Sequence, residues 1–243
     1  GVATDGTSNN GIVALTQSGS TNTATIGQAT DGGSATGGTS AIVDQTATGG
    51  TVTVAQGVGS SGISVGSTST VDQDGDGDIV LVGQGVFGSS TGDESVIEQG
   101  PSGTNRAETG QGFGFGNTSS NNDATIRQLT GSVNYAQIGQ AGALFFGTGN
   151  TASESDATVT QDGSNNFGYI YQGSSLGNPG VDGASSFNDS ATIDQNADGN
   201  TARIHQGVDG AASSNSTATI TQNTNGNMST VVQSGNMNTA TVT

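Results

Sequence analysis

The sequence predicts an all-β solenoid, in which about eight and a half coils of strand–turn–strand repeats stack in a cross-β arrangement. Glutamine recurs in regularly spaced pairs, and the segment before each Gln alternates between apolar and polar residues. Ile, Leu, Val and Phe together make up just under 18% of the 243 residues. That content fits a disordered chain or a thin repetitive core, and it excludes an ordinary α/β enzyme core of this length.

The glutamine spacing defines the repeats. Two Gln residues 11 or 12 positions apart mark each unit, and a new unit begins after about 29 residues. We predict one solenoid domain over residues 1–243, with repeats ending near residues 28, 56, 84, 111, 140, 172, 206 and 233 and a half-repeat over 234–243. The pairs are Gln17/Gln28, Gln45/Gln56, Gln73/Gln84, Gln99/Gln111, Gln128/Gln140, Gln161/Gln172, Gln195/Gln206 and Gln222/Gln233.

Each glutamine ends a segment that is typical of a β-strand. Ala124, Ile126 and Gln128 alternate with Thr125 and Arg127, and most other units repeat this order of small, β-branched and amide side chains. Residues two apart in a strand share one face, so the Ala, Ile and Gln side chains point inward. Stacking then hides a narrow core without large side chains, and coils about 4.8 Å apart make a rod roughly 40 Å long.

A tight turn joins the two strands of a unit, and a longer linker leads to the next unit. Gly19, Gly75 and Gly163 stand two residues after the first Gln, where a reversal requires positive φ. We expect the Gln side chains to form amide ladders with their equivalents one coil away. The same is expected of Asn22, Asn105, Asn134, Asn166, Asn200, Asn227 and Asn238.

Charge and composition exclude several function classes. Three arginines face 20 carboxylates, for a net charge of −17, and such a chain repels nucleic acid. Without cysteine there is no disulfide or thiolate site, and no apolar run is long enough to span a membrane as a helix. The lone His205 lies beside no nucleophile or acid–base pair, so we expect a surface residue, no enzyme activity and no cofactor.

One acidic segment has two interpretations. Asp72, Asp74, Asp76 and Asp78 stand at alternate positions with Gly77 among them, which resembles the start of a calcium-binding loop. The twelfth position of that loop is Gly83, where a bidentate Glu would close the site. The alternative is that these residues form the turn of the third unit and bind Ca²⁺ weakly or not at all.

The repeat resembles that of curlin, the major subunit of bacterial curli fibres. The pattern S-x5-Q, a Gly-containing turn and N-x-A-x3-Q is met in its first half by Ser67–Gln73, Ser155–Gln161 and Ser216–Gln222. Its second half is met by Asn22–Gln28, Asn105–Gln111, Asn134–Gln140 and Asn200–Gln206. The departures are longer units and a first position occupied by Thr39, Asp93, Asn122 or Asp189.

The resemblance implies a secreted subunit that polymerises with itself into extracellular, amyloid-like fibres at the cell surface. Such pilus-like fibres belong to the biofilm matrix and mediate adhesion and cell aggregation. The resemblance also implies an outer-membrane secretion pore and, in some members, a nucleator subunit as partners. The sequence has no signal peptide, as expected of a mature secreted chain.

The alternative function is that of a monomeric binding module. Thr25, Thr125, Thr192 and Thr219 point outward in the predicted strands and could form a flat hydroxyl array that contacts ice or a polysaccharide. Asp44, Arg127 and Asp194 interrupt that array, which favours the fibre subunit.

Overall fold

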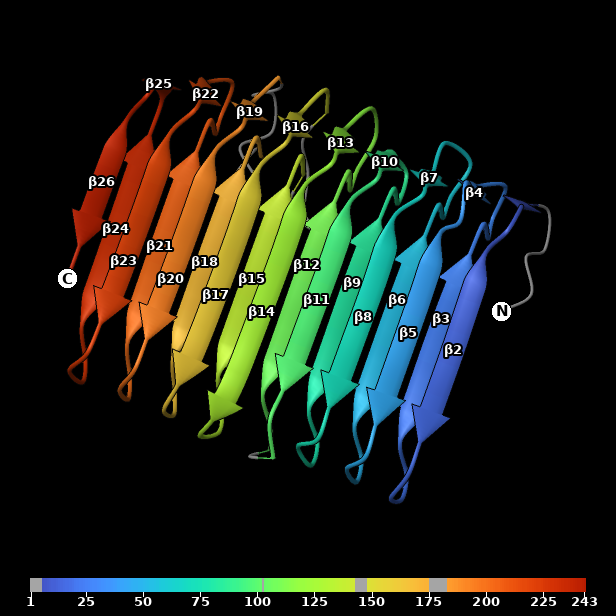
Figure 1. Ribbon diagram of the computed structural model, residues 1–243, viewed down its shortest axis with the longest axis horizontal. Helices are drawn as coiled ribbons and strands as arrows, with labels where there is room; N and C mark the ends of the chain where they lie inside the picture. The colour runs from blue at the N-terminus through green and yellow to red at the C-terminus, as the bar shows by residue number, and fades with distance from the viewer. Residues whose placement is uncertain (1–5, 102, 143–147, 175–182) are drawn as a thin grey trace.

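The computed structural model is an all-β solenoid and confirms the predicted fold class. It describes residues 6–101, 103–142, 148–174 and 183–243. The strands form three parallel sheets that run the length of the molecule, from the N-terminal coil to the C-terminal coil (Figure 1). Each coil contributes one strand to each sheet, except that the C-terminal half-coil adds none to the second sheet, and a coil pairs only with its neighbours on either side.

The first sheet contains the strands that end at the first Gln of each unit. It has nine strands and includes the last strand of the chain. Its members are β2 (Ile12–Gln17), β5 (Ser40–Gln45), β8 (Thr68–Gln73), β11 (Glu94–Gln99), β14 (Asp123–Thr130), β17 (Asp156–Asp162), β20 (Ser190–Gln195), β23 (Thr217–Gln222) and β26 (Thr239–Val242).

The second sheet contains the strands that end at the second Gln and packs face to face against the first. It has eight strands, so the first sheet extends one strand further at the C-terminal end. Its members are β3 (Thr23–Gln28), β6 (Thr51–Gln56), β9 (Ile79–Gln84), β12 (Arg106–Gln111), β15 (Tyr135–Gln140), β18 (Phe167–Gln172), β21 (Thr201–Gln206) and β24 (Met228–Gln233).

A third, short sheet lies in the segments that the sequence analysis treats as linkers. It closes one edge of the coil, opposite the turns that join the first and second sheets (Figure 1). Its strands have two or three residues, too few for the alternation of side chains to be visible in the sequence. They are β1 (Thr7–Ser8), β4 (Ser34–Thr36), β7 (Ile63–Val65), β10 (Ser89–Thr91), β13 (Thr118–Ser120), β16 (Thr151–Ser153), β19 (Ser185–Phe187), β22 (Ala212–Ser214) and β25 (Gly235–Asn236).

The core between the first and second sheets is narrow and built from small and β-branched side chains. In the middle coils, for example, Ala124 and Ile126 of β14 lie in one buried cluster with Ala136 and Ile138 of β15. Equivalent residues are aligned without offset, as in the pairing of Ile126 with Ile97 on one side and Val159 on the other. Every coil therefore repeats the same packing, and the low apolar content is sufficient to fill the interior.

Candidate functional site

Two columns of glutamine run through the interior along the whole solenoid. In the first sheet, Gln45 Nε2 donates to Gln73 Oε1 at 2.8 Å, and the equivalent bonds link Gln17 to Gln222 at 2.7–3.0 Å. In the second sheet, the bonds that link Gln28 to Gln233 are 2.8–3.0 Å long. In both columns each coil donates to the next coil toward the C-terminus, so the amides all point one way.

The asparagines form a ladder of a different kind. Each Oδ1 accepts from the backbone N–H of the equivalent residue in the next coil, as Asn134 Oδ1 does from Asn166 N at 3.0 Å. The Nδ2 of Asn134 turns back and donates to the turn carbonyls of Thr130 at 3.2 Å and Gly163 at 2.7 Å, whereas the buried Nδ2 of Asn166 has no partner. The bonds that involve Asn22, Asn105, Asn134, Asn166, Asn200 and Asn227 follow the same Oδ1 pattern.

Two positions depart from this asparagine ladder. Gly50 occupies the ladder position in the second coil, where an added Cβ would lie 2.3 Å from Gln73 Oε1, so a side chain there would require Gln73 to shift. Asn238 lies elsewhere: β26 pairs with β23 so that Thr239 is opposite Thr217, which places Asn238 in the column of Ser216. The terminal half-repeat thus continues the first sheet.

Asp78 takes the place of asparagine in the third coil. Its Oδ1 accepts from Asn105 N at 2.7 Å, but its buried Oδ2 has no hydrogen-bond partner. Burial raises the pKa of this carboxyl to about 7, although the bond from Asn105 lowers it and Asp76 adds to the increase. The carboxyl group is therefore poised to be protonated near neutral pH.

The other three candidate calcium ligands are divided between a strand face and a turn. Asp72 lies on the outer face of β8, whereas Asp74 and Asp76 accept from the turn of the preceding coil, from Thr46 Oγ1 and from Thr48 N at 2.9 Å. In the part of the chain that the structure describes, no group of three or more His, Cys, Asp or Glu side chains could hold a metal ion. The geometry favours the turn interpretation of this segment.

A third column of buried polar residues lies at the corner between the short sheet and the first sheet. Its burial was not predicted from the sequence. It holds the variable first position of the repeat: Thr39, Ser67, Asp93, Asn122, Ser155, Asp189 and Ser216. Asp93 is typical, with its two oxygens accepting from Asn122 N at 3.0 Å and from Ser90 Oγ at 2.6 Å. Burial raises its pKa to about 6, although these hydrogen bonds oppose the shift.

Aromatic and ionisable side chains gather on the outer face of the second sheet. It holds all three tyrosines, two of the three arginines and the only histidine. Glu108 is only 2% exposed there, because Arg106 forms an ion pair with it and the hydroxyl of Tyr135 and Nε2 of Gln137 donate to it at 3.0 and 3.1 Å. The rings of Tyr135 and Tyr169 lie 5.4 Å apart.

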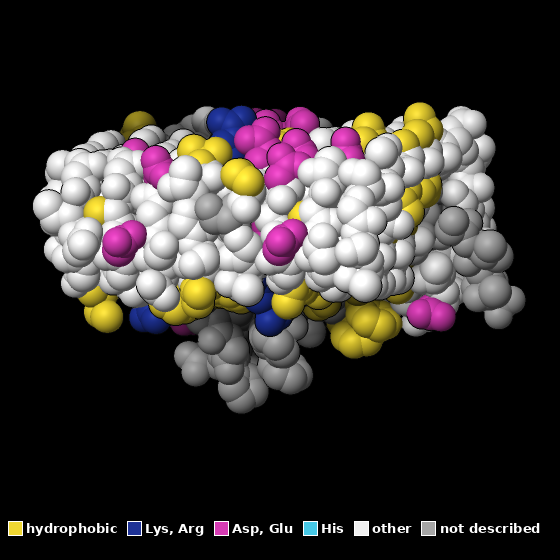
Figure 2. All heavy atoms as spheres, turned by 90° about the horizontal axis from the view of Figure 1, so that it is seen from below, with side chains coloured by type: hydrophobic (Ala, Val, Ile, Leu, Met, Phe, Trp, Pro, Cys, Tyr) yellow, Lys and Arg dark blue, Asp and Glu magenta, His cyan; other side chains and the backbone are white. Residues whose placement is uncertain are grey.

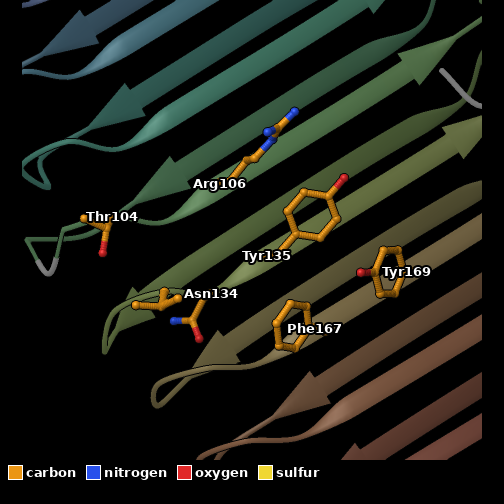
Figure 3. Close-up of a pocket in the computed structure, with 7 residues that line it drawn as sticks. Thr104, Arg106, Asn134, Tyr135, Phe167 and Tyr169 are labelled. Carbon is orange, nitrogen blue, oxygen red and sulfur yellow. The ribbon is translucent and has the colours of Figure 1, made fainter.

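This aromatic cluster surrounds a shallow hollow of about 370 Å³. Arg106, Tyr135, Phe167 and Tyr169 rise from three adjacent strands beside it (Figure 3). One strand further on, the edge of the His205 ring packs against Tyr171, and burial together with Arg203 lowers the pKa of the imidazole. His205 is thus a half-buried packing residue on the outer face.

The outward threonines are divided between two sheets. Thr25 lies on the second sheet, whereas Thr125, Thr192 and Thr219 lie in one column of the first sheet. Thr158 and Thr241 extend that column to five residues without interruption. Asp44, Arg127 and Asp194 occupy the neighbouring column of the same face.

One comparison with known proteins found a match, and that match agrees with the repeat geometry. Among the described residues, no helix has the length and hydrophobicity needed to cross a membrane. A search against curated proteins found no match. Residues 213–243, which include β23, β24 and β26, match the family model of the curlin associated repeat. The chain is thus similar to curlin repeat proteins in its C-terminal coils, where that family match is located.

Proposed function

We propose that this chain is the structural subunit of an extracellular, amyloid-like fibre of the biofilm matrix, where it mediates adhesion and cell aggregation. Copies add end to end, so that the sheets of one molecule continue into the next. On this proposal the chain is secreted, its main partner is itself, and it catalyses no reaction. A secretion pore and a nucleator subunit complete the proposed set of partners.

The observation that carries this proposal is the state of the two end coils. In the N-terminal coil, Val13 and Leu15 occupy core positions of β2 but are 41% and 46% exposed. At the other end, β26 pairs with β23 along one edge, and its second edge faces no strand of the described residues. Unpaired strand edges beside exposed core positions are a template for another chain.

The two ends of the molecule carry matching side chains, which supports the addition of one copy of the chain to another. The C-terminal coil offers a strand of the same alternation, Thr239–Val242, with Ala240 and Val242 on its inner face. A second copy that places its β2 against β26 would cover Val13 and Leu15 with the same kind of packing that each inner coil has. Because the repeats share one alternation, that join continues the first sheet with core residues of the same kind.

Two lysine substitutions in β26 test the proposal. Ala240→Lys places a charge on the inner face of the edge strand, where an incoming coil would have to bury it at a cost of several kcal/mol. Thr241→Lys adds the same charge to the outer face of the same strand and is the matched control. We expect Ala240→Lys to slow fibre elongation by about tenfold or more, and Thr241→Lys to change it little, as measured by thioflavin fluorescence and electron microscopy.

Equal elongation rates for the two variants would contradict end-to-end addition through β26. A cross-β reflection near 4.8 Å from wild-type fibres is expected in addition, and its absence would contradict the fibre itself. Circular dichroism of the soluble variants checks that both retain the β-fold.

A further inference from the structure

The two broad faces of the solenoid differ strongly in charge. The outer face of the first sheet carries one arginine, Arg127, and eight carboxylates: Asp44, Asp72, Glu94, Glu98, Asp123, Asp156, Asp162 and Asp194. Figure 2, a view onto the turns, shows acidic side chains gathered on one long margin, together with basic and hydrophobic ones, whereas the opposite margin shows mainly hydrophobic and basic side chains.

The outer face of the second sheet is apolar and slightly basic. Its one carboxylate, Glu108, is buried and paired with Arg106. Arg203 is exposed, lies 5.5 Å above the Tyr169 ring and makes no salt bridge within the described residues. A guanidinium held against an aromatic ring in a chain of net charge −17 is an unused binding group for a carboxylate.

We propose that these two faces bind each other in a second copy of the chain, the second sheet of one rod against the first sheet of the next. This inference rests on the proposed function, because it describes how the fibres associate side by side. Each strand of six residues is about 20 Å long, and eight strands span roughly 38 Å, so each face offers about 750 Å². That area is close to the roughly 800 Å² per partner of a stable interface.

The contact joins two different surfaces, so it does not close into a dimer. Each rod that binds through its second sheet still offers its acidic first sheet to another rod, and bundles widen in steps. Two packed sheets are about 10 Å apart, so each added rod widens the bundle by about 20 Å. Because coils repeat at one spacing in both partners, rows of side chains on one face meet rows on the other.

Two charge reversals of equal size test this inference. Arg203→Glu places an acid on the second sheet, whereas Arg127→Glu makes the same change on the face that is already acidic. Both lower the net charge equally but on opposite faces, and Arg127→Glu also removes the ion pair with Glu98. We expect Arg203→Glu to reduce the number of rods per bundle at least twofold and Arg127→Glu to leave it unchanged. The cross-sectional radius of gyration from small-angle X-ray scattering reports this number.

The cross-section is independent of elongation, so the outcome is separate from that of the proposed function. Fibres that elongate normally but keep wild-type width in Arg203→Glu would overturn the lateral contact while leaving end-to-end growth intact. Equal thinning by both variants, or wild-type rods of single-copy width at every concentration, would also overturn it. If wild-type rods remain single and instead bind a soluble polyuronate, and Arg203→Glu abolishes that binding, the occupant of this face is an acidic polysaccharide.

Discussion

At the scale of single residues, Asp78 is the least favourable choice in the ladder. Where Asn stands at this position, its Nδ2 can donate to a turn carbonyl, as Asn22 does to Ser18 O at 2.7 Å, although the buried Nδ2 of Asn166 has no partner. The Asp78 carboxylate can only accept, so its buried Oδ2 has no partner and its pKa rises to about 7. The folded state thus binds this proton more tightly than the unfolded state does.

Replacing Asp78 should stabilise the fold at neutral and alkaline pH. A carboxyl with a raised pKa contributes its full stability below pH 3.8 and loses it as the pH rises through about 7. Asp78→Asn removes that loss and supplies the missing donor, so we expect a gain of about 1–3 kcal/mol in the free energy of unfolding at pH 8. Urea unfolding at pH 4 and pH 8 measures it. A gain of equal size at both pH values would contradict the titration of Asp78.

Backbone conformation at the corner before the first sheet is also set residue by residue. The residues there with positive φ between 50° and 64° are Gly66, Gly92, Asn121, Glu154, Asn188, Asn215 and Met237. Glycine and asparagine tolerate this conformation, and Glu154 and Met237 are the exceptions. This recurring Gly or Asn, placed just after a pair of small residues, is the sequence signal that could have revealed the third sheet.

At the scale of the strand, the inward glutamine is the most constrained side chain. Gln140 Oε1 accepts from Gln111, and Gln140 Nε2 donates to Gln172 Oε1 at 3.0 Å and to Ser155 O at 2.7 Å. All of these groups are buried between coils. Removing the amide leaves its hydrogen-bond partners on both sides unsatisfied, because no water can replace it there.

Gln140→Leu should therefore destabilise the fold by about 2–3 kcal/mol, through the unsatisfied acceptors it leaves. Thr125→Val, an equally conservative change on the outer face of β14, should stay within about 0.5 kcal/mol. The midpoints of urea unfolding compare the two variants. A loss for Gln140→Leu no larger than that for Thr125→Val would show that the ladder contributes little to stability.

Alternation and glutamine spacing predicted the first and second sheets closely, because both signals repeat in every unit. Gln28 and Gln56 end strands as expected, and Thr239–Val242 is the terminal strand. The aromatic cluster was beyond prediction, because Arg106, Tyr135 and Tyr169 come from different coils and only the register brings them together. The sequence also could not distinguish Asp78, which turns inward, from Asp72, which faces outward.

At the scale of the whole molecule, charge opposes the approach of two copies. Each carries −17, so assembly should accelerate with added salt at fixed pH, because screening weakens the repulsion. It should also accelerate as the pH falls toward the isoelectric point of about 4.1. The raised pKa values of Asp78 and Asp93, about 7 and about 6, act in the same direction, because protonation stabilises the folded coil.

Thioflavin kinetics over a salt series and a pH series measure the two effects separately. Growth rates that do not respond to salt would show that net charge does not limit assembly. A response to salt without a response to pH would show that the buried carboxyls do not titrate in the range expected.

The single direction of the glutamine amides gives the molecule a built-in polarity. The donor chains begin at Gln17 and Gln28 and end at Gln222 and Gln233. One end of the rod is therefore a row of carbonyl acceptors and the other a row of amide donors. Two like ends would present acceptors to acceptors or donors to donors, whereas unlike ends present donors to acceptors. Every copy in a filament should then face the same way, and the two tips of the filament should elongate at different speeds.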